Sequence, residues 1–94
     1  MHFVITCVDR PDHGHVRAEN RPAHLEHLKA QGARLLVAGP TTSDDGGQVT
    51  GSVIVLDCAD RAQAEAFAAA DPYSRAGLFE TVHITAWRKV FPAD

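Results

Sequence analysis

The segment VTGSVIVL, residues 49–56, has the β-branched, apolar composition of a buried strand. A strand with only one covered face alternates apolar and polar side chains along its length. Residues 53–56 are instead Val, Ile, Val and Leu, so both faces of this strand are apolar. The segment therefore predicts a sheet with two faces that need cover.

Three further segments predict strands from the same kind of composition. They are residues 3–8, 35–38 and 79–90. The first two of these segments are also apolar on both faces. Gly39 and Pro40 are expected to close the strand 35–38, and residues 41–47 are expected to form the mobile tip of a hairpin.

Residues 16–31 predict a helix between the first two strands, with Leu25 and Leu28 on its apolar face. Gly32 is placed to end this helix in the left-handed conformation.

Pro22 leaves two interpretations of how this helix starts. In one, Asn20 caps a shorter helix that has Pro22 in its first turn. In the other, a longer helix begins at Val16 and is kinked at Pro22.

A second, alanine-rich helix is predicted between the third and fourth strands. Asp60 is its expected N-cap, because its side chain can accept a hydrogen bond from the first turn. The helix is expected to end at Asp71-Pro72, and residues 73–77 are expected to form a turn before the last strand.

These segments give the order β-α-β-β-α-β in one α+β domain, residues 1–94. With right-handed crossovers, this order predicts a four-stranded antiparallel sheet in the order 4-1-3-2, with both helices on one face. The other face would then expose more apolar surface than soluble monomers tolerate. We therefore expect a homodimer that pairs sheet face against sheet face. The alternative is that the C-terminal strand and the loops fold over this face.

The formal charge of -3 and the isoelectric point near 6.0 argue against a nucleic-acid partner, because such proteins cluster Lys and Arg. No apolar run approaches the roughly 20 residues that cross a bilayer, and the N-terminal segment has no basic start. We therefore expect a cytoplasmic protein with no membrane partner. Cys7 and Cys58 are expected at opposite ends of the sheet, so we expect no disulfide between them.

Four short motifs follow one another along the chain: Arg21-Pro22-Ala23-His24-Leu25, Ala38-Gly39-Pro40, Thr50-Gly51-Ser52, and Asp71-Pro72-Tyr73 followed by Ala76-Gly77. Together they resemble the YCII family, and the resemblance runs from the first strand to Val90-Phe91. It implies a ferredoxin-like fold and a dimeric α+β barrel. It also implies a site built around a His and an Asp, which match His24 and Asp71.

The topology independently brings His24 and Asp71 to one edge of the sheet, because the first helix starts and the second helix ends there. A carboxylate bonded to one imidazole nitrogen fixes the tautomer and raises the basicity of the other nitrogen, which suits a general acid or base. A structural interpretation stands beside this one. Asp71 before Pro72 can cap a short turn, and His24 can be a satisfied, half-buried residue.

Arg21 lies on the same helix stripe as His24 and Arg17. Its guanidinium can hold an anionic group of a substrate. The alternative is that Arg21 is a solvated surface residue.

Four other residues are candidates for contact with a small-molecule ligand. Gly39, Pro40 and Ser52 lie at the ends of hairpin strands, where the backbone and the Ser52 hydroxyl can reach a ligand. Hairpin geometry alone also accounts for glycine at these strand ends. Tyr73 either lines the pocket or packs in the core.

The sequence predicts no metal and no cofactor. Asp12, His13 and His15 form a loose cluster, but a zinc site needs further ligands that converge on one point, so we expect a solvated loop. Gly46-Gly47 lies in a hairpin, whereas a nucleotide-binding loop joins a strand to a helix. Neither cysteine has a cationic neighbour in sequence that would make it a nucleophilic thiolate.

The leading hypothesis is a small-molecule enzyme in which His24 moves a proton, Asp71 orients His24 and Arg21 holds substrate charge. Its reaction would be a cofactor-free isomerisation, elimination or proton transfer on a small, partly apolar compound, as in related dimeric α+β barrels. The alternative is a non-catalytic module that binds a metabolite or docks a protein through the same pocket. In a third interpretation, the dimer is only an assembly element.

Overall fold

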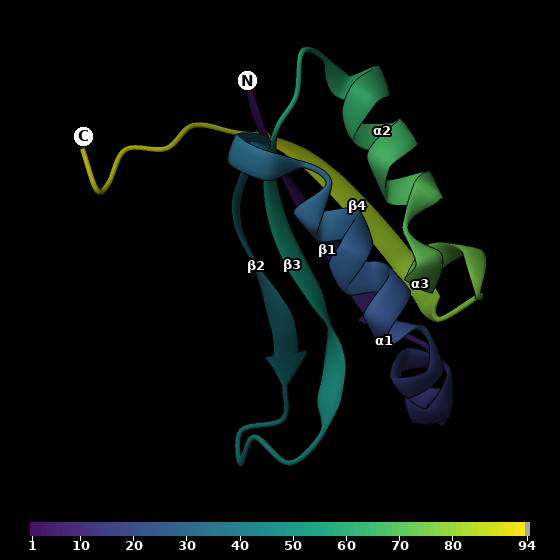
Figure 1. Cartoon of the computed structure of the whole chain (residues 1–94). Coiled ribbons are helices and arrows are strands. Elements are labelled where there is room, and N and C mark those ends of the chain that lie inside the picture. Colours follow the sequence, from purple (N-terminus) through teal and green to yellow (C-terminus); the bar gives the residue numbers. More distant parts are fainter. Residues whose placement is uncertain (94) are drawn as a thin grey trace.

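A computed structural model describes residues 1–93 and shows an antiparallel sheet of four strands with the helices on one face (Figure 1). In chain order, the elements are β1 (His2–Asp9), α1 (Gly14–Lys29), the 3-10 turn η1 (Gly32–Arg34), β2 (Leu35–Thr42), β3 (Val49–Asp57), α2 (Arg61–Ala70), α3 (Pro72–Arg75) and β4 (Phe79–Trp87). The strand order β2-β3-β1-β4 is the predicted order 4-1-3-2 read from the opposite edge. The predicted α+β fold is therefore confirmed.

The hydrophobic core lies between the sheet and the helices. Ile5 in the middle of β1 is 1% exposed and pairs in register with Ile54 of β3 and Ile84 of β4. Ala64 and Phe67 of α2 pack against this apolar layer. The area that these side chains remove from water is the main contribution to folding.

β2 is longer than predicted, because it continues through Gly39 and Pro40 to Thr42. Pro40 pairs with Ser52 of β3. A proline is tolerated here because β2 is the edge strand, where a missing N–H removes no hydrogen bond to a further strand. The expectation that Gly39 and Pro40 close the strand was therefore wrong.

α1 is continuous from Gly14 through Pro22 to Lys29. The shorter of the two predicted helices is therefore wrong. The side chain of Asn20 lies inside the helix and donates a hydrogen bond to the carbonyl of Val16 at 2.8 Å.

The face that α1 turns toward the core is more polar than predicted. Leu25 is 41% exposed, so its assignment to the core face was wrong, whereas Leu28 packs against the core as expected. The buried residue of α1 is His24. Gly32 has the predicted left-handed conformation, with φ of 60°, but it opens η1 after α1 has already ended at Lys29.

α2 and α3 follow one another directly and are separated by one residue, Asp71, which caps the start of α3. The side chain of Asp60 accepts from the backbone N–H of Gln63, as predicted for an N-cap. α2 ends at Ala70, and the segment predicted as a turn begins instead with the short helix α3, whose first residue is Pro72. The last strand, β4, ends at Trp87 and is shorter than predicted.

On β1, β2 and β3, valines lie on the face of the sheet that points away from the helices. Val55 of β3 pairs with Val4 of β1 on one side and with Val37 of β2 on the other. Val37 is 57% exposed. Figure 1 shows that β2 and the end of the β2–β3 hairpin extend beyond the helices. We call this surface, formed by Val4, Val37, Val53 and Val55, the outer sheet face.

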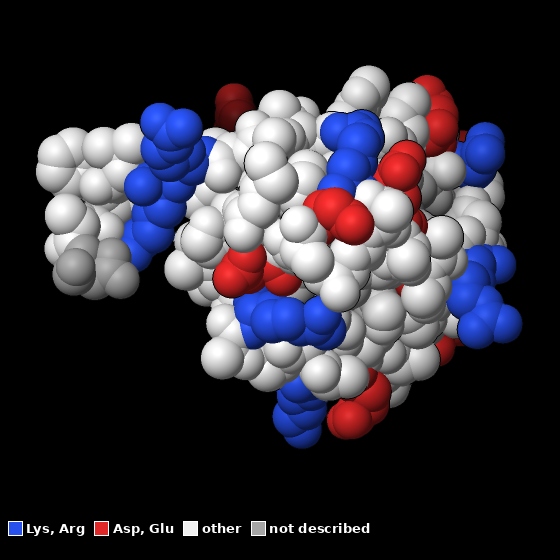
Figure 2. Space-filling view, turned by 90° about the horizontal axis from the view of Figure 1, so that it is seen from above, with Lys and Arg blue, Asp and Glu red and all other residues white. Residues whose placement is uncertain are grey.

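Basic and acidic side chains are interspersed on the surface seen in Figure 2. Within residues 1–93, none of the helices combines the length and the apolar character that a membrane span requires. Cys7 lies in β1 and Cys58 follows β3, at opposite ends of the sheet as predicted, and both are buried free thiols.

Replacing Gly51 by Ala is expected to destabilise the protein by about 1–3 kcal/mol, because the added methyl group would overlap the Cys7 carbonyl of the neighbouring strand. Gly39→Ala is the matched control, since a Cβ at Gly39 meets no atom within 4 Å. Urea denaturation measures the free energy of unfolding of both variants. Equal losses in the two variants would contradict the close approach of β3 to β1 at this point.

Candidate functional site

A cavity of about 890 Å³ opens between α1 and the β2–β3 hairpin. Five residues that the sequence predicted for the site line it: Arg21, His24, Gly39, Pro40 and Tyr73. Asp71 and Ser52, the other two, lie behind the cavity surface and are 2% and 3% exposed. The fold therefore brings these seven residues into one region of the molecule.

His24 and Asp71 form a buried hydrogen-bonded pair. The imidazole Nδ1 lies 2.9 Å from Oδ1 and 3.1 Å from Oδ2 of Asp71. Because a carboxylate only accepts, Nδ1 carries the hydrogen and Nε2 is the nitrogen left with a lone pair when the ring is neutral. Within residues 1–93 no protein group bonds to this Nε2, and His24 lines the cavity. The pair has the arrangement of a histidine base and its orienting carboxylate.

Asp71 also has the structural role that the sequence left open. Its Oδ1 accepts a hydrogen bond from the backbone N–H of Tyr73 at 2.9 Å and so caps α3. The same carboxylate therefore both caps a helix and orients His24. The two interpretations are compatible because a carboxylate has several lone pairs to offer.

Tyr73 packs flat against His24. The ring centroids are 4.0 Å apart and the planes are inclined by 15°. The residue is 1% exposed, and burial raises the pKa of its hydroxyl, an effect opposed by the positive charge of Arg17. The Tyr73 ring supports one face of the imidazole, while Asp71 binds its Nδ1.

Arg17 is a residue of this region whose contacts the sequence did not reveal. Its Nε and Nη2 donate to the two carboxylate oxygens of Asp9 at 2.8 and 2.9 Å. Nη2 also donates to Ser52 Oγ at 3.1 Å, and the guanidinium carbon lies 4.6 Å from the centre of the Tyr73 ring. Burial alone would lower the pKa of Arg17, but the hydrogen bonds to Asp9, the negative charge of Asp9 and the interaction with Tyr73 together raise it. Its position on the stripe of His24 was the only sequence signal.

Ser52 and Arg21 differ in what they contact. The hydroxyl of Ser52 accepts from Arg17 and does not reach the cavity surface. Arg21 lines the cavity, is exposed, and forms no ion pair within residues 1–93. Of the two arginines near His24, Arg21 is thus the one whose charge is available to a ligand.

Cys7 lies under the site in β1 and is 5% exposed. Burial, followed by the negative charges of Asp71 and Asp9, raises the pKa of its thiol to about 12. The neutral thiol is a poor nucleophile near pH 7.

The loop of residues 11–13 lines one side of the cavity, whereas His15, expected in the same loop, lies in the first turn of α1, so that expectation was wrong for His15. Nδ1 of His13 donates to the carbonyl of Pro11 at 2.8 Å, and the rings of His13 and His15 are 6.0 Å apart. Among residues 1–93 there is no group of three or more His, Cys, Asp or Glu side chains placed to hold a metal ion. Asp12 in this loop has a left-handed backbone, with φ of 60°.

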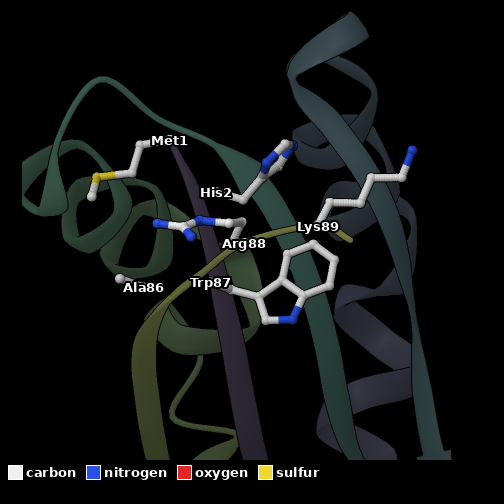
Figure 3. Close-up of a pocket in the computed structure, with 6 residues that line it drawn as sticks. All are labelled: Met1, His2, Ala86, Trp87, Arg88 and Lys89. Atoms are coloured by element: carbon white, nitrogen blue, oxygen red, sulfur yellow. The ribbon is translucent and has the colours of Figure 1, made fainter. Parts of the chain in front are cut away.

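A second hollow, of about 640 Å³, lies beside the start of β1 and the end of β4 (Figure 3). The rings of His2 and Trp87 meet there edge to face, with centroids 5.9 Å apart. The part of this hollow formed by residues 1–93 has no carboxylate in its lining. It therefore lacks the acid–base pair of the first cavity.

The amino-acid sequence of the chain is similar to those of known proteins. A family model of the YCII-related domain matches residues 1–88. The protein YciI of Escherichia coli O6:H1 is 39% identical, over 97% of this chain and 100% of that protein. An uncharacterized protein of Haemophilus influenzae is 35% identical over the same shares of the two chains.

Solved structures show the same fold. A 5-chloro-2-hydroxyhydroquinone dehydrochlorinase from Burkholderia phenoliruptrix AC1100, in complex with 2,5-dihydroxybenzoquinone, has a TM-score of 0.88 and 33% identity, and each chain covers 100% of the other. A putative antibiotic biosynthesis monooxygenase from Nitrosomonas europaea has a TM-score of 0.60 at 11% identity, covering 99% of this chain and 92% of that one, and shows likeness of fold alone.

Iodoacetamide at pH 8.5 is expected to leave Cys7 unmodified in the folded protein, because its pKa of about 12 keeps the thiol protonated and burial blocks access. Unfolding in urea removes both protections, so alkylation should then be rapid. Mass spectrometry of the peptide that contains Cys7 measures the extent of reaction. Rapid modification of the folded protein would contradict this account of the thiol.

Proposed function

The chain belongs to the YCII-related family, and on this premise we propose that it is a small-molecule enzyme in which His24 and Asp71 perform cofactor-free acid–base catalysis. The observation that carries the proposal is the buried Nδ1 hydrogen bond of His24 to Asp71 at the surface of a cavity. Such a pair leaves Nε2 to exchange a proton with a bound compound.

In the proposed reaction, Nε2 of His24 takes a proton from a C–H or O–H group of the substrate. The electron pair of the broken bond moves into the substrate. In an elimination it expels a leaving group together with that group's bonding pair. In an isomerisation the proton returns from Nε2 to another atom. Asp71 stabilises the imidazolium that forms between these steps, since its carboxylate already accepts from Nδ1.

We propose a small, planar, oxygen-substituted ring as the substrate. The dehydrochlorinase that is 33% identical is named for a chlorinated hydroxyhydroquinone and was solved with a dihydroxybenzoquinone. The cavity here suits such a compound, because it combines the apolar side chains of Leu25 and Pro40 with the charge of Arg21. An ionised ring hydroxyl would pair with Arg21.

The remaining residues predicted for the site are proposed to shape it. Gly39 and Pro40 form the side of the cavity that β2 contributes, where the backbone can approach a ligand. Tyr73 presents its ring beside His24, and Ser52 acts from behind the surface through Arg17. These roles account for both the lining residues and the buried ones.

We also propose that two copies pair through the outer sheet face. An apolar surface that the helices leave open is a typical interface between identical subunits. Val37, 57% exposed, lies on this face next to Val55. Pairing would bury it without covering the helices.

His24→Ala is expected to lower kcat by about 10²- to 10⁴-fold, the usual contribution of a general acid or base. Compounds are first selected from a panel of small hydroxylated aromatics and quinones by their effect on the melting temperature, and product formation is then measured. Asp71→Asn should also lower kcat, while its amide oxygen still caps α3 for Tyr73.

His15→Ala is the matched control, since this exposed histidine of α1 is outside the cavity lining. It should turn the same compound over at the wild-type rate. Full activity of His24→Ala would overturn the catalytic proposal. Stabilisation by a compound that is never converted would identify a binding module instead.

Sedimentation at micromolar concentration is expected to show a dimer for the wild-type protein. Val37→Asp should weaken this dimer, because it places a charge in the apolar interface. The protomer should still fold, because Val37 is exposed in the single chain. Leu25→Asp is the control, with comparable exposure on α1, away from the outer sheet face. A folded wild-type monomer would contradict the proposed pairing.

A further inference from the structure

We propose that Arg17 is a positioning residue, which holds the Tyr73 ring against His24 and thereby fixes the direction of Nε2 in the cavity. This inference rests on the proposed function of His24. Two contacts carry it: His24 stacks on Tyr73 with ring centroids 4.0 Å apart, and the Arg17 guanidinium carbon lies 4.6 Å from the centre of the same ring.

The spacing along α1 lets a single ring contact both side chains. Arg17 and His24 are seven residues apart, which is nearly two helical turns and about 10.5 Å along the axis. Side chains two turns apart lie on the same face of a helix. The Tyr73 ring, which α3 contributes, contacts both of these side chains.

The guanidinium is itself held tightly enough to act as a support. Two hydrogen bonds join Arg17 to the carboxylate of Asp9, and a third joins it to Ser52. These partners lie at the end of β1 and in the middle of β3, so the support is anchored in the sheet. A planar cation above an aromatic face also adds electrostatic attraction between the two groups.

The same contacts make Arg17 a poor substrate anchor. Its charge is already balanced by Asp9, whereas Arg21 has no ion pair within residues 1–93. A lysine at position 17 would keep the charge but would lose the planar fork that bonds to both oxygens of Asp9. Arg17→Lys therefore separates the effect of shape from the effect of charge.

The experiment follows the hydrogen on Nδ1 of His24 by proton NMR, in protein whose histidines carry ¹⁵N. A proton shared with a buried carboxylate gives a resonance downfield of the amides, and its absence in His24→Asn assigns it. The variants are Arg17→Lys and the double variant Asp9→Asn with Arg17→Gln, which leaves no buried carboxylate unpaired. Arg61→Gln is the control, because this arginine is exposed at the start of α2.

The resonance is expected to broaden or vanish in both Arg17 variants and to remain in Arg61→Gln. With a compound that the wild-type protein converts, kcat should fall by about 10- to 100-fold, because the base is misplaced, while KM changes little. A sharp, unshifted resonance in either folded Arg17 variant would overturn the proposal. Unfolding of both variants would also count against it, since Arg17 would then be required for the fold.

The resonance is observed without substrate, so the two proposals can fail separately. If the Arg17 variants lose the resonance but His24→Ala remains fully active, the positioning proposal is supported and catalysis by His24 is overturned. If His24→Ala is inactive but the resonance is unchanged in the Arg17 variants, the catalytic proposal is supported and the positioning proposal is overturned.

Discussion

Asp71 is a buried carboxylate, and such a group is stable only when its oxygens accept hydrogen bonds from well-placed donors. Its two donors are Nδ1 of His24 and the backbone N–H of Tyr73. The first bond fixes where α1 passes α3, and the second fixes how α3 starts after α2. The stack of His24 on Tyr73 and the shape of that end of the cavity follow from these two bonds.

The order of the elements could be predicted because it depends on patterns that the sequence states directly. Apolar runs gave the strands, and the handedness of crossovers then left one sheet order. The boundaries at Gly39 and Pro40 could not be predicted in the same way, because a proline stops a central strand but is tolerated on an edge strand. Leu25 was misplaced for a related reason: the side chain that α1 turns inward is a histidine, which hydrophobic periodicity does not count.

The candidate site was partly accessible from topology. The meeting of His24 with Asp71 could be anticipated because the helix that carries one and the helix end that carries the other lie at the same edge of the sheet. The contacts of Arg17 could not, because they depend on side-chain directions from β1, β3 and α3 together. Ser52 shows the same limit, since its place in β3 was predicted but its bond to Arg17 was not.

Arg17 and Arg21 both line the cavity from α1, but their positive charges have different surroundings. Arg17 is tied to Asp9, so it contributes shape and little net charge. Arg21 keeps its positive charge at the cavity surface, opposite an edge strand that the helices do not cover. The end of the cavity at His24, where we propose proton transfer, is thus built from interlocked side chains, which suits a base because a base must be held within a fraction of an ångström. The end at Arg21, which we propose recognises the substrate, can adjust to different oxygen-substituted rings, since a long exposed side chain has many rotamers of similar energy.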